Sequence, residues 1–401
     1  MKIAFLTALP YGSVANTMYN VADAAIKSGH TCYTFSKPIK NFVNKRENHE
    51  FIGSTFSVKL HSFLAAYTGY HGLFSVCATL KLIRRLKKIK PDVLMLLNLH
   101  GWYINLPLFF NYIKKNDIKI VWSFPDFWPI TGYCTGFAGI ECDKWQTCCY
   151  DCPQYKEYPQ SKVDRSKQLY KLKSKWFSNI NNLTLVAITK YLSGFIEKSF
   201  LKQYDCRVIY NGVDLDVFKP TPSDFRQQYG LQDKFVVLGV ASDWSNRKGL
   251  DVMIKLSKRL DDRFKVVLVG LEKLDGDHNM LVIPAQKPEQ LSKIYTAADV
   301  FANPTRAEAF GNVNIEALAC GTPIVMFNTD GAPESIDETC GVVVEKEDIE
   351  NMQKHIENVC TNKTLSKEAC LKRAAFFEKD KRINEYVKLF EEVIEDDRKS
   401  N

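Results

Sequence analysis

The sequence lacks the features that mark several common protein classes. It contains no zinc-finger, homeodomain or aromatic-rich RNA-binding motif, so nucleic acid is the least suitable partner for its net charge of +8. It also shows no repeat of fixed period and no low-complexity tract, which argues against a repeat protein or a disordered chain. A nucleotide or a phospholipid surface remains as the anionic partner that the positive charge suits.

Long uninterrupted apolar runs are missing too. The most apolar stretch, Leu94 to Ile113, contains Asn98, His100 and Pro107, which are costly in hydrocarbon without a partner. The apolar start of the chain is followed by Pro10, without the small-residue pattern of a signal-peptide cleavage site. We therefore expect a first β-strand rather than a signal peptide, and a cytoplasmic protein without a transmembrane helix.

The length of 401 residues exceeds what one hydrophobic core usually supports. Short runs rich in Val, Ile and Leu alternate with longer amphipathic stretches, which is typical of strands and crossover helices in parallel sheets. The sequence therefore predicts an α/β fold with two doubly wound, Rossmann-like domains. The predicted strands are Lys2–Leu6, Thr31–Phe35, Val93–Asn98, Ile118–Ser123 and Thr184–Ile188 in the first half, and Val208–Tyr210, Phe235–Val240, Lys265–Val269, Leu281–Ile283, Val300–Asn303, Pro323–Met326 and Gly341–Val344 in the second.

The domain boundary is expected where a lysine-rich helix ends and a new strand begins, between Phe195 and Val208. This gives an N-terminal domain of residues 1–200 and a C-terminal domain of residues 201–378. In residues 379–401 an amphipathic helix carries Ile383, Tyr386 and Phe390 on one stripe. We expect this helix to pack back toward the N-terminal domain.

Two stretches at strand ends are candidates for binding an anion. Gly12 and Ser13 follow the first predicted strand, where glycine lets a phosphate approach and the next helix offers its N–H groups. The full dinucleotide-binding glycine motif is absent there, so a simple turn is the alternative. Arg247 and Lys248 follow the strand Phe235–Val240. Cations before a helix oppose its dipole unless an anion compensates, which indicates a diphosphate site.

A third stretch, Pro304 to Pro323, is predicted to run through a loop, a helix and a glycine stop into a strand. Glu308 falls in the loop and Glu316 in the second helical turn. Because carboxylates repel a diphosphate, we expect them to accept hydrogen bonds from the hydroxyls of a sugar or a ribose. The candidate residues for binding the nucleotide are Gly12, Ser13, Arg247, Lys248, Phe310, Gly311, Asn312, Val313 and Glu316.

Three motifs in this order resemble retaining glycosyltransferases of family 4. They are Glu308 and Glu316 with Glu-Ala-Leu-Ala-Cys-Gly-Thr-Pro, the Arg-Lys-Gly-Leu segment at 247–250, and Tyr-Asn-Gly-Val-Asp at 210–214 with Phe-Lys-Pro at 218–220. The resemblance covers essentially the whole chain, and the combined order is highly specific. It implies the GT-B architecture, with two Rossmann-like domains that face each other across a cleft. The first domain would bind the acceptor and the second the donor.

The resemblance also implies roles for single residues. Glu308 would contact hydroxyls of the donor sugar, Glu316 the ribose and Lys248 the diphosphate, with no metal needed for catalysis. The implied reaction moves a hexose from a UDP-, GDP- or dTDP-linked donor to a saccharide or lipid-linked acceptor, with retention at the anomeric carbon, in bacterial surface-polysaccharide or glycan biosynthesis. A non-catalytic partner subunit of the same fold and a sugar-nucleotide 2-epimerase are the alternatives.

Two positions depart from the family pattern. Ser242 stands where many relatives carry an arginine, which leaves Arg247 as the substitute cation. Pro125 precedes Asp126 where relatives commonly show His-Asp, and proline neither donates a hydrogen bond nor relays a proton. Asp126 and His100, both near predicted strand ends, therefore join Glu308 and Lys248 as candidate catalytic residues. His100 would bind the acceptor or orient the donor sugar, unless it is only structural.

Five of the twelve cysteines crowd between Cys134 and Cys152. Four of them have separations short enough to surround one tetrahedral ion, which indicates a structural zinc site. Free thiols or a disulfide are the alternatives, because the first spacing is longer than in standard zinc ribbons. The candidate zinc ligands are Cys134, Cys142, Cys149 and Cys152.

Basic residues cluster at Lys81–Lys88 and Arg165–Lys175, the second interleaved with Leu169, Tyr170 and Trp176. Helical spacing gives each stretch a basic face beside an apolar one. Such a helix either lies on an anionic membrane surface or covers a core. Our hypothesis is peripheral contact with the inner face of the plasma membrane.

Overall fold

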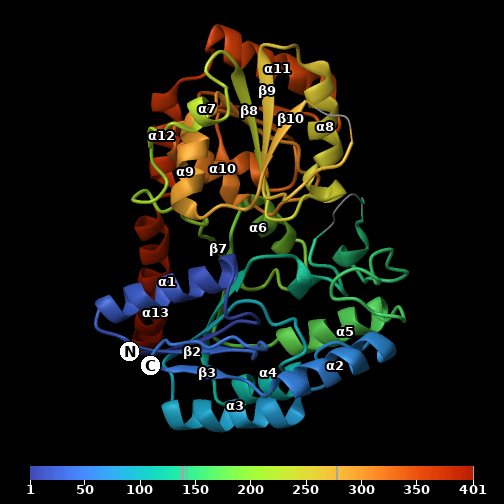
Figure 1. Cartoon of the computed structure of the whole chain (residues 1–401). Helices are drawn as coiled ribbons and strands as arrows, with labels where there is room; N and C mark the ends of the chain where they lie inside the picture. Colours follow the sequence, from blue (N-terminus) through green and yellow to red (C-terminus); the bar gives the residue numbers. More distant parts are fainter. Residues whose placement is uncertain (137–139, 141, 277–278, 401) are drawn as a thin grey trace. The chain divides into compact units, whose positions relative to one another are not determined.

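The computed structural model describes residues 1–136, 140, 142–276 and 279–400. The chain forms two compact units (Figure 1). Of the described residues, the N-terminal unit contains 1–136 and 142–209 together with the last helix from Ile383 onward, and the C-terminal unit contains Ile140 and the chain from Tyr210 to Arg382. Among the described residues no helix is long and apolar enough to cross a membrane.

The N-terminal unit is built on a seven-stranded parallel sheet of order β3-β2-β1-β4-β5-β6-β7. Its central strands are buried on both faces, as parallel strands between helices should be. The chain order reverses between the neighbours β1 and β4, which makes a topological switch point where α/β folds bind ligands. The strands are β1 (Lys2–Leu6), β2 (Thr31–Ser36), β3 (His49–Phe51), β4 (Val93–Leu96), β5 (Lys119–Phe124), β6 (Leu183–Ala187) and β7 (Asp205–Val208).

Helices cover both faces of this sheet (Figure 1). On one face α1 buries Met18, Val21 and Ala22, because its small and apolar residues recur at helical spacing. The helices of the other face include the basic helix α3. The helices of the unit are α1 (Ser13–Lys27), α2 (Thr55–Thr68), α3 (Val76–Ile89), α4 (Leu106–Lys115), α5 (Ser166–Phe177), α6 (Lys190–Ile196) and α13 (Lys379–Ser400).

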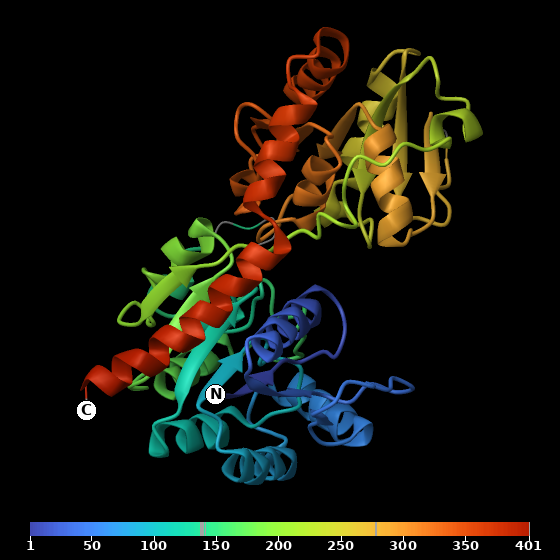
Figure 2. The same cartoon turned by 90° about the vertical axis from the view of Figure 1, so that its left-hand side faces the viewer.

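The C-terminal helix α13 shares its core with α1 and the first strands. Ile383, Val387 and Phe390 lie in one apolar cluster with Phe5 and Met18. The hydroxyl of Tyr386 is hydrogen-bonded to Ser123 Oγ of β5 at 2.9 Å. Figure 2 shows α13 running along the N-terminal sheet beside α1. The last helix is therefore an integral layer of the N-terminal unit.

The C-terminal unit repeats the plan with six parallel strands of order β10-β9-β8-β11-β12-β13. Helices α8 and α11 pack together on one apolar cluster, and α10 contacts α9 and α12. The strands are β8 (Phe235–Val240), β9 (Phe264–Val269), β10 (Met280–Ile283), β11 (Val300–Asn303), β12 (Ile324–Phe327) and β13 (Gly341–Val344). The helices are α7 (Phe225–Gln228), α8 (Leu250–Arg259), α9 (Pro288–Ala297), α10 (Asn312–Ala319), α11 (Ile349–Asn362) and α12 (Lys367–Phe376).

The predicted α/β class with two Rossmann-like parallel sheets is confirmed. Two strand assignments differ. The predicted strand Val208–Tyr210 is wrong, because β7 ends at Val208 and pairs with β6 in the N-terminal sheet, while Tyr210 packs on Phe310 and Phe377. The short β3 was not predicted, because a three-residue edge strand carries almost no periodic signal.

We expect α13 to contribute to the stability of the N-terminal unit. Phe390 is fully buried and its ring meets that of Phe5 edge to face at 6.0 Å. Phe390→Ala should lower the free energy of unfolding by about 3–5 kcal/mol, measured by urea denaturation, because it leaves a cavity. The exposed Glu392→Ala is the matched control. A loss as small as the control's would show that α13 is not part of the core.

Candidate active site

The turn after β8 and the loop after β11 are joined at the switch point of the C-terminal sheet. The backbone N–H of Arg306 donates to Arg247 O at 2.8 Å, and Arg247 Nη1 donates to Ala307 O at 3.0 Å. Gly249 has φ 76°, and a Cβ there would lie 2.3 Å from Pro304 O. Glycine is therefore required at this position for the two segments to approach. The contact brings the predicted cations to the loop that carries Glu308.

Lys248 and Glu308 form an ion pair between these segments. The side chains are 18% and 22% exposed, so both charges are mostly withdrawn from water but open on one side. The Glu308 N–H also donates to Asp330 Oδ2 at 2.9 Å, which fixes the loop. Two residues 60 apart in the chain thus meet as expected for one site. An anionic ligand beside Lys248 would compete with Glu308 for the ammonium group.

The start of α10 offers unpaired backbone donors. Gly311 precedes the helix with φ 85°, no side chain caps the helix, and its first turn contains no acidic residue. These features leave the first N–H groups, from Gly311 to Val313, for an anion or solvent. Asn312 Oδ1 accepts from Asn211 Nδ2 at 3.0 Å. The Phe310 side chain is buried against Tyr210 and Phe377, so only its backbone can face a ligand.

Asn314 holds this helix start in place, and sequence reasoning did not single it out. Its side chain is fully buried. Asn303 Nδ2 donates to Asn314 Oδ1 at 2.7 Å, and Asn314 Nδ2 donates to Ser335 Oγ at 3.0 Å. A fully satisfied polar network of this kind fixes one geometry in a core. Asn314 therefore anchors α10 to the end of β11.

Glu316 lies one turn further along α10. Its carboxylate accepts a hydrogen bond from Tyr295 OH of α9 at 3.4 Å. Burial raises the pKa of Glu316 to about 7, which the bond from Tyr295 offsets only in part. A carboxyl group with such a pKa is present near neutral pH in both its protonated and its ionised form, so it can donate as well as accept a hydrogen bond.

In the N-terminal unit, His100 and Asp126 meet at the ends of β4 and β5. His100 Nε2 lies 3.0 Å from Asp126 Oδ2, and Trp128 N–H donates to Asp126 Oδ1 at 2.9 Å. His100 Nδ1 lies 2.9 Å from the hydroxyl of Tyr158, whose pKa burial raises to about 12. In the neutral imidazole, a phenol that donates to Nδ1 leaves the proton on Nε2, facing Asp126. Tyr158 is a residue of this cluster that no motif in the sequence indicated.

Trp128 of this cluster is held by a buried lysine. Lys173 of α5 is fully buried, and its Nζ lies 3.6 Å from the centroid of the Trp128 ring. The ammonium donates to Trp128 O at 2.7 Å and to Thr131 O at 3.0 Å. Burial lowers the pKa of Lys173 to about 7. The contacts fix the segment that follows Asp126.

The predicted zinc site is not supported. Within residues 1–136, 140, 142–276 and 279–400, no group of three or more His, Cys, Asp or Glu side chains is arranged to hold a metal ion. Cys134 instead donates a hydrogen bond to Cys152, which is the main cause lowering the pKa of Cys152 to about 7. Cys149 Sγ accepts from Gly132 N–H at 3.2 Å. Both Cys134 and Cys149 interact electrostatically with Lys173, so an ammonium group supplies the positive charge among these thiols.

Gly12 and Ser13 lie directly after the β1 segment, at the carboxyl edge of the N-terminal sheet. Gly12 has φ 87°, and α1 begins at Ser13 without a side-chain cap. A Cβ at Gly12 would meet no atom within 4 Å, so backbone conformation rather than space explains the glycine here. The binding of an anion at this uncapped helix start stays a prediction.

The raised pKa of Glu316 predicts a pH-dependent stability. The folded protein keeps this carboxyl protonated up to about pH 7, while the unfolded chain ionises it near its ordinary value of 4.5. The free energy of unfolding therefore decreases as the pH rises from 4.5 to about 7. Above pH 7 Glu316 causes no further decrease, because it is ionised in both the folded and the unfolded state. Glu316→Gln should raise the melting temperature by about 3 °C at pH 8 and hardly at pH 5. An equal gain at both pH values, or the same gain in the exposed control Glu345→Gln, would contradict this assignment.

Two family models match the chain. A model described as Glycosyltransferase Family 4 matches residues 14–217, and one described as Glycosyl transferases group 1 matches residues 223–386. The colanic acid biosynthesis glycosyl transferase WcaC of Escherichia coli K12 is 23% identical over 98% of this chain and 99% of that protein. The D-inositol 3-phosphate glycosyltransferase of Segniliparus rotundus is 33% identical over 34% of this chain and 35% of its own length.

Solved structures share the fold. Sucrose-phosphate synthase from Thermosynechococcus elongatus has a TM-score of 0.69 at 15% identity, covering 98% of both chains. Anabaena HepE in complex with UDP-glucose has a TM-score of 0.67 at 15% identity, covering 98% of this chain and 100% of that one. The paired family models and the two Rossmann-like units lead to one conclusion: the chain belongs to glycosyltransferase family 4 and is a group 1 glycosyltransferase of the GT-B fold.

Proposed function

We propose that the protein transfers a hexose from a nucleotide-sugar donor to a saccharide or lipid-linked acceptor, with retention at the anomeric carbon. The C-terminal unit would bind the donor and the N-terminal unit the acceptor. The observation that carries the proposal is the open Lys248–Glu308 pair beside the uncapped start of α10. Similarity to WcaC supports a role in surface polysaccharide biosynthesis, and similarity to HepE, crystallised with UDP-glucose, supports a nucleotide-sugar donor.

In this proposal Lys248 and Arg247 meet the donor diphosphate together with the N–H groups of Gly311, Asn312 and Val313. When the bond between the anomeric carbon and the phosphate oxygen breaks, negative charge grows on the β-phosphate, and these fixed donors stabilise it. They supply the positive charge themselves, so we propose a metal-independent reaction.

The two glutamates would position the neutral parts of the donor. Glu308, released from Lys248 when a diphosphate binds, would accept hydrogen bonds from sugar hydroxyls. Glu316 would contact the ribose, for which its raised pKa suits it. In the N-terminal unit, His100 would contact the acceptor, with Asp126 and Tyr158 fixing its orientation through both ring nitrogens.

Removal of the charges at the donor site tests this function. Lys248→Met should lower kcat for donor turnover about 100-fold or more, because one fixed donor to the developing charge is lost. Glu308→Gln should also remove turnover, yet keep the thermal stabilisation by a free nucleoside diphosphate, which has no sugar. The measurement is release of nucleoside diphosphate from UDP-, GDP- and dTDP-sugars, with and without acceptor.

The exposed Lys258→Met on α8 is the control for this series and should keep full activity. Full turnover by Glu308→Gln would refute the role of that residue. Binding of all three donors without turnover in the unmodified protein would instead indicate a non-catalytic partner subunit.

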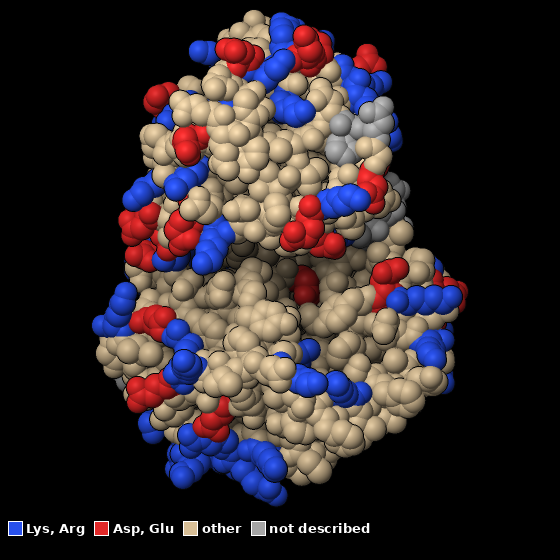
Figure 3. All heavy atoms as spheres, in the orientation of Figure 1, with Lys and Arg blue, Asp and Glu red and all other residues tan. Residues whose placement is uncertain are grey.

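We also propose that the N-terminal unit contacts an anionic membrane surface through α2 and α3. Helix α2 buries only Ala65 and exposes Phe56, Leu60, Phe63 and Tyr67 along one face. Helix α3 adds exposed cations, which gather at the lower edge of the molecule in Figure 3. They are Lys81, Arg84, Lys87 and Lys88. An apolar stripe beside cations is the pattern that binds anionic lipid.

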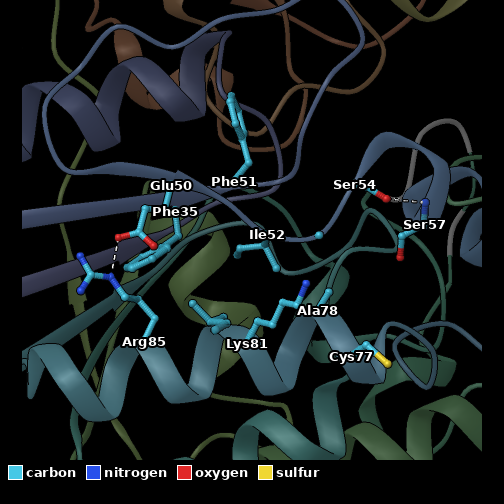
Figure 4. Close-up of a pocket in the computed structure, with 12 residues that line it drawn as sticks. Phe35, Glu50, Phe51, Ile52, Ser54, Ser57, Cys77, Ala78, Lys81 and Arg85 are labelled. Atoms are coloured by element: carbon cyan, nitrogen blue, oxygen red, sulfur yellow. Dashed lines mark hydrogen bonds and ion pairs between the residues drawn. The ribbon is translucent and has the colours of Figure 1, made fainter.

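A cavity of about 470 Å³ lies between β3, the start of α2 and α3 (Figure 4). Arg85 of α3 pairs with Glu50 of β3 on one side of it, and Ser54 caps α2 on the other. The second basic stretch, by contrast, buries Leu169, Tyr170 and Lys173 in α5, so that helix covers a core.

Flotation with vesicles tests the membrane contact. The full-length protein should float with phosphatidylcholine vesicles that contain phosphatidylglycerol, and less with phosphatidylcholine alone. Arg84→Gln combined with Lys88→Gln should weaken binding about tenfold or more, because each cation near the surface contributes about 1 kcal/mol. Lys167→Gln combined with Lys171→Gln on α5 should change little. Binding that is indifferent to lipid charge would refute the proposal.

A further inference from the structure

Lys37 is a buried cation without a protein partner at the carboxyl edge of the N-terminal sheet. It follows β2 directly, and its backbone N–H donates to Ala8 O at 3.2 Å. The residue is only 8% exposed. Among the described residues, no carboxylate lies within ion-pair distance of Nζ and no acceptor lies within hydrogen-bond distance of it. Burial accordingly lowers the pKa of Lys37.

Lys173, the second lysine named above as buried in this unit, has the contacts expected of a structural lysine. Lys173 satisfies its ammonium group with two backbone carbonyls and the face of Trp128. Lys37 has an aromatic ring at 5.7 Å, that of Trp102, and no carbonyl. Lys37 is largely buried, yet its ammonium nitrogen still reaches solvent. An anion that approaches from the solvent side can therefore pair with it. The difference between the two lysines is what points to a ligand.

The chain that faces Lys37 is held in an unusual conformation. A Cβ on Gly101 would lie 3.4 Å from Lys37 Nζ, and Gly101 has φ 113°. The next residue, Trp102, has φ 64°, which is uncommon for a bulky side chain. Trp102 Nε1–H donates to His71 Nδ1 at 3.2 Å, and its ring meets Tyr158 at 5.8 Å. The loop thus places a residue without a side chain, Gly101, and the indole ring of Trp102 beside the ammonium group of Lys37.

This loop also carries His100, so Lys37 belongs to the candidate acceptor cluster. Tyr158 contacts both His100 and Trp102. We propose that Lys37 binds an anionic group of the acceptor, with Trp102 and Tyr158 lining the same subsite as aromatic surfaces for a sugar ring. The inference rests on the proposed function and deepens it, because it assigns the acceptor to the acidic class.

A lysine ammonium is a compact charge, and unlike the planar guanidinium of arginine it does not select one planar anion by two parallel hydrogen bonds. The anionic group is therefore a carboxylate of an acidic sugar or a phosphate attached to a sugar. Either the carboxylate or the phosphate could pair with the Lys37 ammonium group. The binding experiment below distinguishes the two.

Saturation-transfer NMR on the full-length protein tests this subsite with three ligands that share one ring: methyl glucoside, methyl glucuronide and glucose 1-phosphate. At least one of the two anionic ligands should bind more tightly than the neutral glucoside. Lys37→Met should reduce that binding at least tenfold, Lys37→Arg should retain part of it, and Lys40→Met, an exposed neighbour, should retain it fully. Loss for the glucuronide alone identifies a carboxylate, and loss for glucose 1-phosphate alone identifies a phosphate.

Two further measurements keep this test separate from that of the donor site. Lys37→Met should melt at an equal or higher temperature than the unmodified protein, because the ammonium group makes no ion pair or hydrogen bond with the described residues; a lower melting temperature would indicate a structural lysine. Thermal stabilisation by UDP should be unchanged in Lys37→Met and reduced in Lys248→Met. Anion binding that does not depend on Lys37, or UDP stabilisation that does, would overturn the inference, whatever the fate of the proposed function.

Discussion

The ion pair between Lys248 and Glu308 is the constraint on which the candidate site of the C-terminal unit depends. It joins the turn after β8 to the loop after β11, and both segments end at the switch point of the sheet. Gly249 makes the approach possible, since any side chain there would collide with Pro304 O. In the proposed function a diphosphate would replace Glu308 beside the ammonium group, which would leave the carboxylate for hydroxyl recognition.

Buried hydrogen bonds and aromatic packing fix the loop and the helix start that surround this pair. Asn314 ties the start of α10 to Asn303 and Ser335 through buried hydrogen bonds. The Phe310 ring is packed against Tyr210 and Phe377, so the loop before α10 is fixed from behind. Backbone N–H groups held in this way cost no reorganisation when charge develops in front of them. One departure from the family pattern fits this arrangement: Ser242 is exposed, and Arg247 donates to the same loop that its neighbour Lys248 contacts.

The N-terminal unit uses buried cations in two different ways. Lys173 is satisfied by carbonyls and an indole face and serves to fix Trp128 behind Asp126. Lys37 lacks such acceptors and faces the loop of His100. Cys134 and Cys149 interact electrostatically with Lys173. A metal ion bound to these thiols would add a second positive charge beside that lysine. The two buried lysines of this unit therefore differ in their surroundings, and our proposal of an anion near Lys37 rests on that difference.

The sequence by itself determined the architecture and the motifs of the glycosyltransferase family. Apolar periodicity is a local property, so strands such as Phe235–Val240 and Val300–Asn303 were predicted with their bounds. The spacing of Glu308 and Glu316 is likewise written in one contiguous stretch. Tertiary structure alone decided which distant residues meet. Tyr158 reaches His100 across 58 positions, Asn314 finds Ser335, and Lys37 is left without a partner. The four cysteines had the spacing for a zinc site but not the arrangement. The physical reason is that hydrogen bonds, burial and unpaired charge depend on distances across the fold, which the order of residues along the chain does not contain.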